Sequence, residues 1–99
     1  MATLKWTEEA LRSLQNVHDY ISEQNPGAAS KTISTLLEKT ETIVSFPSIG
    51  YHYRLVAEGD LRVLPSGHYR IAYIYSEPDA VILIGFFHGA MEIDHYLPK

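Results

Sequence analysis

The chain has 99 residues, of which 45% are hydrophobic and 20% charged, a composition typical of one globular domain spanning residues 1–99. It contains no cysteine, which excludes disulfide frameworks, thiolate metal sites and cysteine nucleophiles. Twelve acidic and eight basic side chains give a net charge of −4 without any basic run, so we expect no direct nucleic-acid binding by the protein alone.

The start of the chain predicts a short strand followed by a helix. Residues 3–6 alternate polar and apolar side chains, as a strand does. Thr7 is a suitable N-cap for a helix running to about Gln24, and two glutamates follow it in the first turn. The apolar positions recur at helical spacing and predict the buried face, which comprises Leu11, Leu14, Val17 and Ile21.

A second helix is predicted from about Pro26 to Val44. Asn25 followed by proline is a helix-start signal, because proline suits the first helical position. The helix should end before residues 46–50, which contain a proline and a glycine. Its predicted apolar face consists of Ala29, Ile33, Leu36, Leu37, Ile43 and Val44, with Thr40 in the gap.

From Tyr51 onward the apolar periodicity changes to that of strands. A weak strand is expected over about residues 51–58, a second over 61–65 and a third over 69–75. Residues 80–87 are nearly all apolar, which favours a central strand buried on both faces. The prediction is an α+β fold of order βααβββ(β), in which a helical hairpin packs on a small, mainly antiparallel sheet.

Two kinds of residue on the predicted sheet could carry chemistry. Arg70 could hold a phosphate or carboxylate, with Arg62 as its neighbour across the sheet, or it could be a solvated arginine paired with an acid. His88, at the end of the last strand, could act as an acid or base, or it could cap the strand by hydrogen bonding. Arg54 is expected at the surface.

No other site is expected from the sequence. The acids and histidines after His88 match no spacing with a defined metal geometry, and no motif for a cofactor or nucleophile is present, so we expect neither a metal nor a cofactor. No apolar run reaches the roughly 18 residues that span a membrane, and the first residues do not form a secretory signal. We therefore expect a cytoplasmic protein without membrane contact.

Several segments, in this order and spacing, carry a resemblance to a known family. They include Trp6-Thr7, Asn25-Pro26, residues 46–50 (Phe-Pro-Ser-Ile-Gly), residues 65–73 (Pro-Ser-Gly-His-Tyr-Arg-Ile-Ala-Tyr) and residues 88–92 (His-Gly-Ala-Met-Glu). The chain resembles the ParE/RelE superfamily, specifically its ParE-like branch. The resemblance implies a toxin of a type II toxin–antitoxin module, silenced by a cognate antitoxin protein and causing growth arrest.

The resemblance leaves three activities open. ParE-like members are associated with inhibition of DNA gyrase and would not be enzymes in this reading. RelE-like members are ribosome-dependent mRNA endonucleases, for which the matching positions here are Arg70, His88 and Tyr96. The basic residue expected after the last strand is missing from residues 88–92, which would weaken stabilisation of a phosphoryl-transfer transition state and favours gyrase. The third possibility is a degenerate toxin that only binds its antitoxin and co-represses its own operon.

Two contact surfaces follow from this interpretation. A disordered antitoxin tail could fold beside the helical hairpin as a helix, or add a strand to a sheet edge. We expect it to contact apolar side chains at the margins of the hairpin: Leu11, Leu14, Tyr20, Leu36 and Leu37. We expect the gyrase-binding surface in the C-terminal residues, at Met91, Glu92, His95 and Tyr96.

Overall fold

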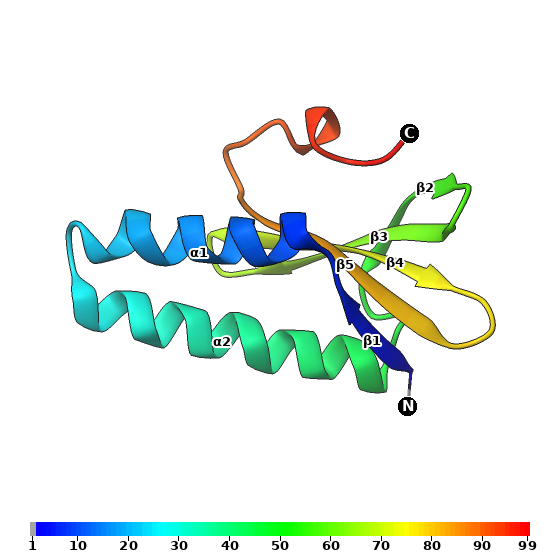
Figure 1. Ribbon diagram of the computed structural model, residues 1–99, viewed down its shortest axis with the longest axis horizontal. Helices are drawn as coiled ribbons and strands as arrows, with labels where there is room; N and C mark the ends of the chain where they lie inside the picture. Colours follow the sequence, from blue (N-terminus) through cyan, green and yellow to red (C-terminus); the bar gives the residue numbers. More distant parts are fainter. Residues whose placement is uncertain (1) are drawn as a thin grey trace.

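The computed structural model describes residues 2–99 and shows two helices beside one sheet (Figure 1). In chain order the elements are β1 (Thr3–Trp6), α1 (Glu8–Ser22), α2 (Pro26–Ser45), β2 (Tyr51–Val56), β3 (Gly59–Ser66), β4 (Tyr69–Ser76), β5 (Ala80–His88) and a 3-10 helix (Ile93–His95). The predicted α+β architecture is confirmed. Its order is βααββββ, with the fourth strand after the helices present.

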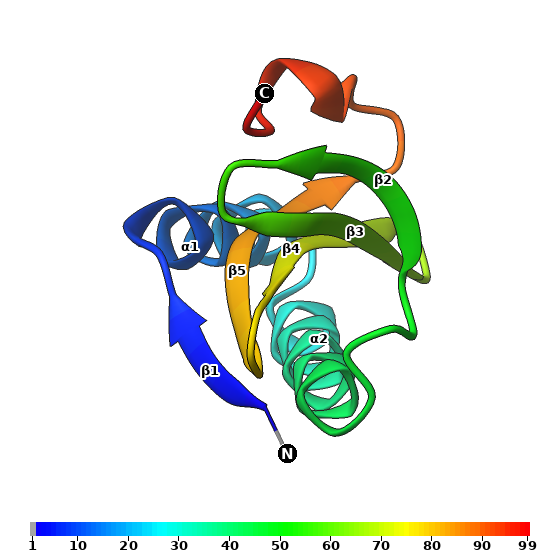
Figure 2. The ribbon, with the colours of Figure 1, turned by 90° about the vertical axis from the view of Figure 1, so that its right-hand side faces the viewer.

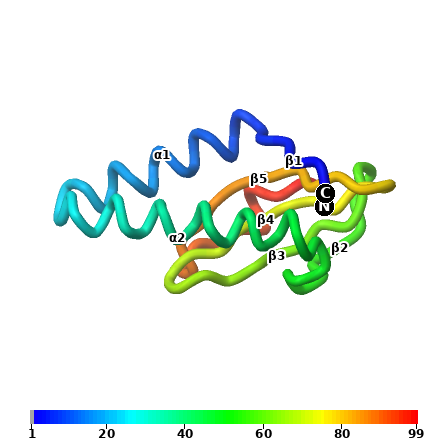
Figure 3. The backbone as a smooth tube through the Cα atoms, turned by 90° about the horizontal axis from the view of Figure 1, so that it is seen from below, coloured from blue at the N-terminus to red at the C-terminus, as the bar shows by residue number. Residues whose placement is uncertain are grey.

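The two helices form an antiparallel hairpin (Figure 3). A side-chain cap fixes the start of each helix. Thr7 Oγ1 accepts a hydrogen bond from the amide of Ala10 at 3.1 Å, and Asn25 Oδ1 accepts one from the amide of Ala28 at 3.2 Å. Each cap satisfies an amide that has no partner inside the helix. Both predicted caps are therefore confirmed.

The buried faces of the helices differ from the prediction at two leucines. Leu11 is 56% exposed and Leu37 is 40% exposed, although both fit the helical apolar spacing. The most buried positions on α1 are Ala10 and Val17, and Leu36 on α2 is only 1% exposed. Periodicity located the correct stripe, but each helix touches the sheet along a narrower line than the stripe of apolar residues.

The sheet has the strand order β1-β5-β4-β3-β2. Strands β2 to β5 are antiparallel neighbours, whereas β1 runs parallel to β5 and pairs only with its first half, Ala80–Leu83. Strand β4, rather than β5, is the middle strand. The second half of β5 therefore lies beyond the end of β1, and its outer edge faces α1.

The sheet buries apolar side chains on both faces, and two different covers lie over them (Figure 2). On the face toward the helices, the core includes Val17, Leu36, Ile43, Ile71, Tyr73, Leu83 and Phe86. On the other face, the residues after β5 cover a second core that comprises Leu61, Val63, Ala72, Ile74, Phe87, Ile93 and Leu97. The sheet thus forms the middle layer of three.

One extra residue in β5 changes which side chains face the helices. Opposite β4, Ala72 pairs with Gly85 but the next residue, Tyr73, pairs with Leu83, so Ile84 has no partner. Before this bulge the odd-numbered residues of β5 face the helices, and after it Phe86 does. A β-bulge has this effect because side chains alternate with a period of two.

The loop after α2 is held against the sheet by Tyr73. Its hydroxyl donates to the carbonyl of Pro47 at 2.6 Å and accepts from the amide of Gly50 at 2.9 Å. A Cβ at position 50 would lie 2.8 Å from that hydroxyl, so only glycine permits this approach. Burial raises the pKa of Tyr73, which keeps the hydroxyl protonated and able to donate.

Candidate functional site

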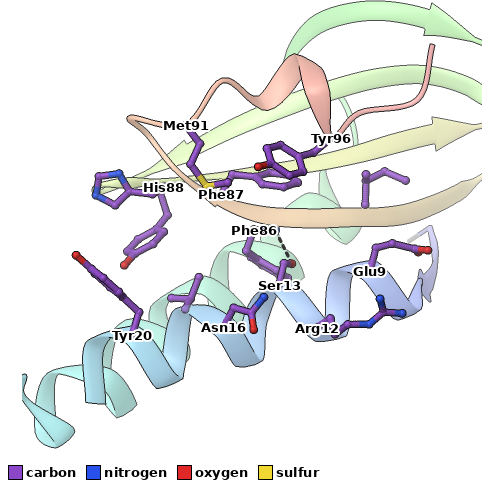
Figure 4. A pocket seen from close by; sticks show the side chains of 13 residues that line it. Glu9, Arg12, Ser13, Asn16, Tyr20, Phe86, Phe87, His88, Met91 and Tyr96 are labelled. Carbon is purple, nitrogen blue, oxygen red and sulfur yellow. Dashed lines mark hydrogen bonds between the residues drawn. The ribbon is translucent and has the colours of Figure 1, made fainter. Parts of the chain in front are cut away.

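A groove of about 580 Å³ lies between α1 and the second half of β5 (Figure 4). Helix α1 lines it with a single stripe of side chains: Glu9, Arg12, Ser13, Asn16, Val17 and Tyr20. The opposite side is formed by Tyr69, Ile84, Phe86, Phe87, His88, Met91 and Tyr96. Its floor is apolar and aromatic, and its polar side chains lie at the rim on α1, an arrangement typical of a peptide-binding groove.

Hydroxyl groups of α1 and its cap occupy part of the outer edge of β5. Thr7 donates to the carbonyl of Leu83 at 2.7 Å, and Ser13 accepts from the amide of Phe86 at 2.9 Å. The carbonyl of His88, at the end of the strand, accepts from the amide of Met91. These three backbone groups would otherwise be free to pair with an added strand. The edge of β5 beside the groove therefore has part of its hydrogen-bonding capacity already satisfied within the chain.

The upper wall of the groove belongs to the C-terminal segment, residues 89–99, which Arg70 ties to the sheet. The guanidinium of Arg70 donates to the carbonyls of Gly89 at 3.2 Å and Met91 at 2.6 Å. These bonds engage one nitrogen of the Arg70 guanidinium, and no acid among the described residues pairs with it, unlike in the paired-arginine alternative from the sequence. Its partners are carbonyls of the same chain.

A second anchor of the C-terminal segment is an ion pair between Arg54 and Asp94. The hydroxyl of Tyr53 donates to the same carboxylate at 3.0 Å, and the Arg54 guanidinium lies 5.2 Å from the centre of the Tyr53 ring. The hydrogen bond from Tyr53, with the charge of Arg54, holds the pKa of Asp94 below its ordinary 3.8. Arg54 is thus partly buried and paired, and the expectation of a plain surface residue is wrong.

Of the three positions of the ribonuclease alternative, His88 and Tyr96 line the groove but Arg70 does not. Strand register pairs Tyr69 with His88 and Arg70 with Phe87. Since successive side chains of a strand point to opposite faces, Arg70 and His88 lie on opposite faces of the sheet. Tyr96 is on the side of Arg70, where its ring centre lies 5.7 Å from that of Phe87.

His88 has local partners that account for its position. Its Nδ1 accepts a hydrogen bond from the amide of Ala90 at 3.1 Å, which confirms the strand-capping alternative. Its ring meets Tyr69 edge to face, with centres 5.5 Å apart. Burial, and to a smaller degree the neighbouring Tyr20, raises the pKa of Tyr69, so this end of the groove carries a neutral phenol.

Arg62 is not the neighbour of Arg70 that the sequence suggested. It lies opposite Tyr73, three residue pairs from the pair formed by Pro65 and Arg70. Its guanidinium binds Asp60 and the carbonyls of Ser48 and Gly50, so it supports the loop after α2. Hairpin register, which depends on the turn at residues 67–68, decided this separation.

The predicted contact residues are divided between surface and core. Tyr20, Met91 and Tyr96 line the groove, and Glu92 and His95 are exposed on the C-terminal segment, where Nε2 of His95 lies 3.3 Å from a carboxylate oxygen of Glu92. Leu14 is half-buried against the helix-face core, whereas Leu36 is inside it and has no surface to offer a partner. Leu11 and Leu37 are exposed but lie outside the groove lining.

Sequence reasoning missed the polar rim of the groove, formed by Arg12, Ser13 and Asn16. A signal for them exists, because they share a helical stripe with Glu9 and Tyr20 beside the apolar one. Among residues 2–99, no cluster of three or more histidine or acidic side chains could hold a metal ion. No helix in the same range is long and apolar enough to cross a membrane.

A model of the ParE toxin of the type II toxin–antitoxin system parDE matches residues 4–93. The chain belongs to the ParE toxin family. The match runs from the second residue of β1 to the first residue of the 3-10 helix, so it includes all the groove-lining residues of this ParE-family toxin except Tyr96. No curated protein matched the chain.

Solved structures of related toxins share the fold of this ParE-family toxin. The chromosomal ParDE toxin–antitoxin system from P. aeruginosa aligns with a TM-score of 0.72 and 17% identity, covering 89% of this chain and 96% of that one. The isolated E. coli RelE toxin aligns with a TM-score of 0.58 and 18% identity over 96% and 92% of the two chains. The RelBE2 toxin–antitoxin complex from Mycobacterium tuberculosis aligns with a TM-score of 0.55 and 17% identity, covering 88% of this chain and 96% of that one.

Proposed function

We propose that this ParE-family toxin is neutralised by a cognate antitoxin protein that occupies the groove between α1 and β5. The observation that carries the proposal is the groove itself, which has an apolar floor and a volume of about 580 Å³ and lies open between α1 and the sheet. Similar folds come from a ParDE system and a RelBE2 toxin–antitoxin complex, which supports a protein partner of the antitoxin kind.

The edge of β5 favours a helical occupant over an added strand at this place. Thr7 and Ser13 already bond the outward-facing backbone groups of Leu83 and Phe86, so a strand added here would have to displace both hydroxyls. A helix needs no backbone partners and presents apolar anchors every three or four residues, which suits an apolar floor with a polar rim. Of the two binding modes predicted from the sequence, the structure therefore favours the helix in this groove.

Replacement of Tyr20 by alanine tests the position of the antitoxin. Tyr20 lines the groove and is exposed, whereas Tyr51 is a similarly exposed tyrosine on β2, away from it. For the antitoxin encoded beside the toxin, Tyr20→Ala should raise Kd about 30-fold, the usual effect of losing an aromatic anchor, and Tyr51→Ala should leave Kd within about threefold. Titration calorimetry measures both constants. Equal constants for Tyr20→Ala and the unmodified toxin would refute the groove as the antitoxin site.

We further propose that the target is DNA gyrase, bound by the exposed residues of the C-terminal segment. Support comes from the separation of Arg70 from His88 across the sheet, the absence of a lysine or arginine in residues 88–92, and the net charge of −4. Met91 and Tyr96 also line the groove, so an antitoxin seated there would cover part of the target-binding surface. Neutralisation would then be direct competition, in the cytoplasm.

Two assays on the purified toxin distinguish the three activities. Gyrase supercoiling should be inhibited and cleaved DNA complexes should accumulate, while mRNA on programmed ribosomes should stay intact. Tyr96→Ala should weaken gyrase inhibition and Tyr51→Ala should not. Codon-specific mRNA cleavage would instead establish the ribonuclease alternative, and inactivity in both assays would indicate a co-repressor that only binds its antitoxin. Deletion of residues 91–99 is a poor test, because it removes Ile93 and Leu97 from the second core.

A further inference from the structure

The C-terminal segment has one side in the second core and the other in the groove. Ile93 and Leu97 are buried against the sheet, whereas Met91 and Tyr96 line the groove and are exposed. The 3-10 helix between them has only three residues. Because Met91, Ile93, Tyr96 and Leu97 follow one another so closely in the chain, we expect a displacement on the core side also to displace the wall of the groove.

The side-chain anchors of this segment come from the sheet, and one backbone hydrogen bond, from the amide of Gly89 to the carbonyl of His68, joins it to the turn before β4. Tyr53 and Arg54 of β2 hold the Asp94 carboxylate, and Arg70 of β4 holds the carbonyls of Gly89 and Met91. Arg54 and Asp94 are 40 residues apart in the sequence. The position of the groove wall is therefore set by residues that do not touch the groove.

These anchors hold the segment only moderately. Asp94 is largely exposed, and an exposed ion pair is weakened by solvent and salt. The Nε atoms of Arg54 and Arg70 are buried without a hydrogen-bond partner among the described residues, which opposes the closed position because an unpaired buried donor is unfavourable. Besides these partly satisfied anchors, the segment is held by Ile93 and Leu97 in the second core and by the packing of Tyr96 on Phe87.

We propose that Tyr53, Arg54 and Arg70 act as positioning residues of a movable groove wall, and that occupation of the groove and closure of the C-terminal segment stabilise one another. This coupling proposal rests on the proposed function only in taking the groove as the site where a protein partner binds. Anything that fills the groove and packs on Met91 and Tyr96 should favour the closed segment. By thermodynamic reciprocity, a loosened segment should bind such an occupant more weakly.

Amide hydrogen exchange on the full chain tests this coupling without any partner. The amides of Tyr96 and Met91 bond to the carbonyls of Ile93 and His88, so their protection reports the closed segment. Asp94→Asn should lower their protection about fivefold, as expected for losing one exposed charged anchor. Glu92→Gln, which changes the other acid of the same segment, should leave protection unchanged. Arg54→Lys keeps the charge but loses the stacked, planar head group. The amide protection of this variant should therefore lie between that of Asp94→Asn and that of the unmodified chain.

The second half of the test fills the groove from within the chain. Asn16 lines the groove from α1, and Asn16→Phe would place an aromatic ring there as a tethered occupant. The variant should raise the protection of the Tyr96 amide and restore it in the Asp94→Asn background. Unchanged protection in Asp94→Asn, or no response of the segment to Asn16→Phe, would overturn the proposal. Either result would leave the antitoxin-binding measurements on Tyr20 unaffected, so the two proposals fail separately.

Discussion

The two faces of the sheet bury similar side chains under unequal covers. One face lies under helices of 15 and 20 residues, whose internal hydrogen bonds keep them in place, and the other lies under a single short segment. The helix side should therefore open only when the whole protein unfolds, while the other side can open locally. The comparison suggests that stability is concentrated on one face, and that the movable parts of a contact surface lie on the other.

The largest expected effect lies in the helix-face core. Leu36→Ala should lower the free energy of unfolding by about 2–5 kcal/mol, because Leu36 is fully buried between α2 and the sheet and its truncation leaves a cavity. Chemical denaturation measures the change. Leu37→Ala, at an exposed position on the same helix, should cost much less. A loss below about 0.5 kcal/mol for Leu36→Ala would show that this face is not the stable one.

A second prediction concerns the hydroxyl of Tyr73, on the same face. Tyr73→Phe should lower stability by about 1–3 kcal/mol, because the amide of Gly50 loses its acceptor and stays buried. Denaturation of the variant gives the value, with Tyr75→Phe as the control on the same strand. If both variants unfold at the same denaturant concentration as the unmodified chain, the hydroxyl does not hold the loop.

The third prediction concerns the face under the C-terminal segment. Ile93→Ala should reduce global stability by only about 1–2 kcal/mol, less than a usual buried isoleucine, because local opening of the segment limits the loss. The protection of the Tyr96 amide should fall by the same free energy, which hydrogen exchange can confirm. A global loss as large as that of Leu36→Ala would show that the two faces unfold together.

Much of this comparison was accessible from the sequence, but its asymmetry was not. The caps at Thr7 and Asn25 are local signals and were read correctly, whereas the strand pattern did not predict the exposure of Leu55 or the bulge in β5. The anchors are not local: Arg54 and Asp94 carry no mark of their pairing, and the distance between Arg62 and Arg70 depends on hairpin register. Leu11 is exposed although the adjacent Ala10 is fully buried, a difference that depends on how α1 is turned toward the sheet and that helical periodicity does not encode.

The smallest predicted effect depends on pH and should appear on one face only. Because the pKa of Asp94 is lowered in the folded chain, its contribution is present above pH 3.8 and is lost as the pH falls through the lowered value. Protection of the C-terminal segment should therefore decline below about pH 4, while the amides of α2 remain protected. In Asp94→Asn this decline should disappear. If the C-terminal segment still loses protection in acid in Asp94→Asn, a group other than Asp94 is responsible for the loss.

A neighbouring acid provides an internal reference for that titration. Partial burial alone would raise the pKa of Asp60, but hydrogen bonds from His52 and Arg62 outweigh it and lower the pKa. Asp60 thus also loses its contribution in acid, but at β2 and β3 rather than at the C-terminal segment. Exchange at the β2 amides should keep its acid dependence in Asp94→Asn, which separates the two carboxylates.

The extra residue in β5 also limits how this strand can change over evolution. Because Ile84 has no partner on β4, the residues before and after it follow opposite alternation. Deleting Ile84 would remove the bulge and leave Phe86 facing the helices and Phe87 facing the C-terminal segment. Inserting one more residue after the bulge would instead turn Phe86 toward the C-terminal segment and Phe87 toward the helices, and so exchange side chains between the two cores. A point substitution in β5 affects one core, whereas such an insertion affects both, so this strand should tolerate loss of the bulge residue better than a further insertion.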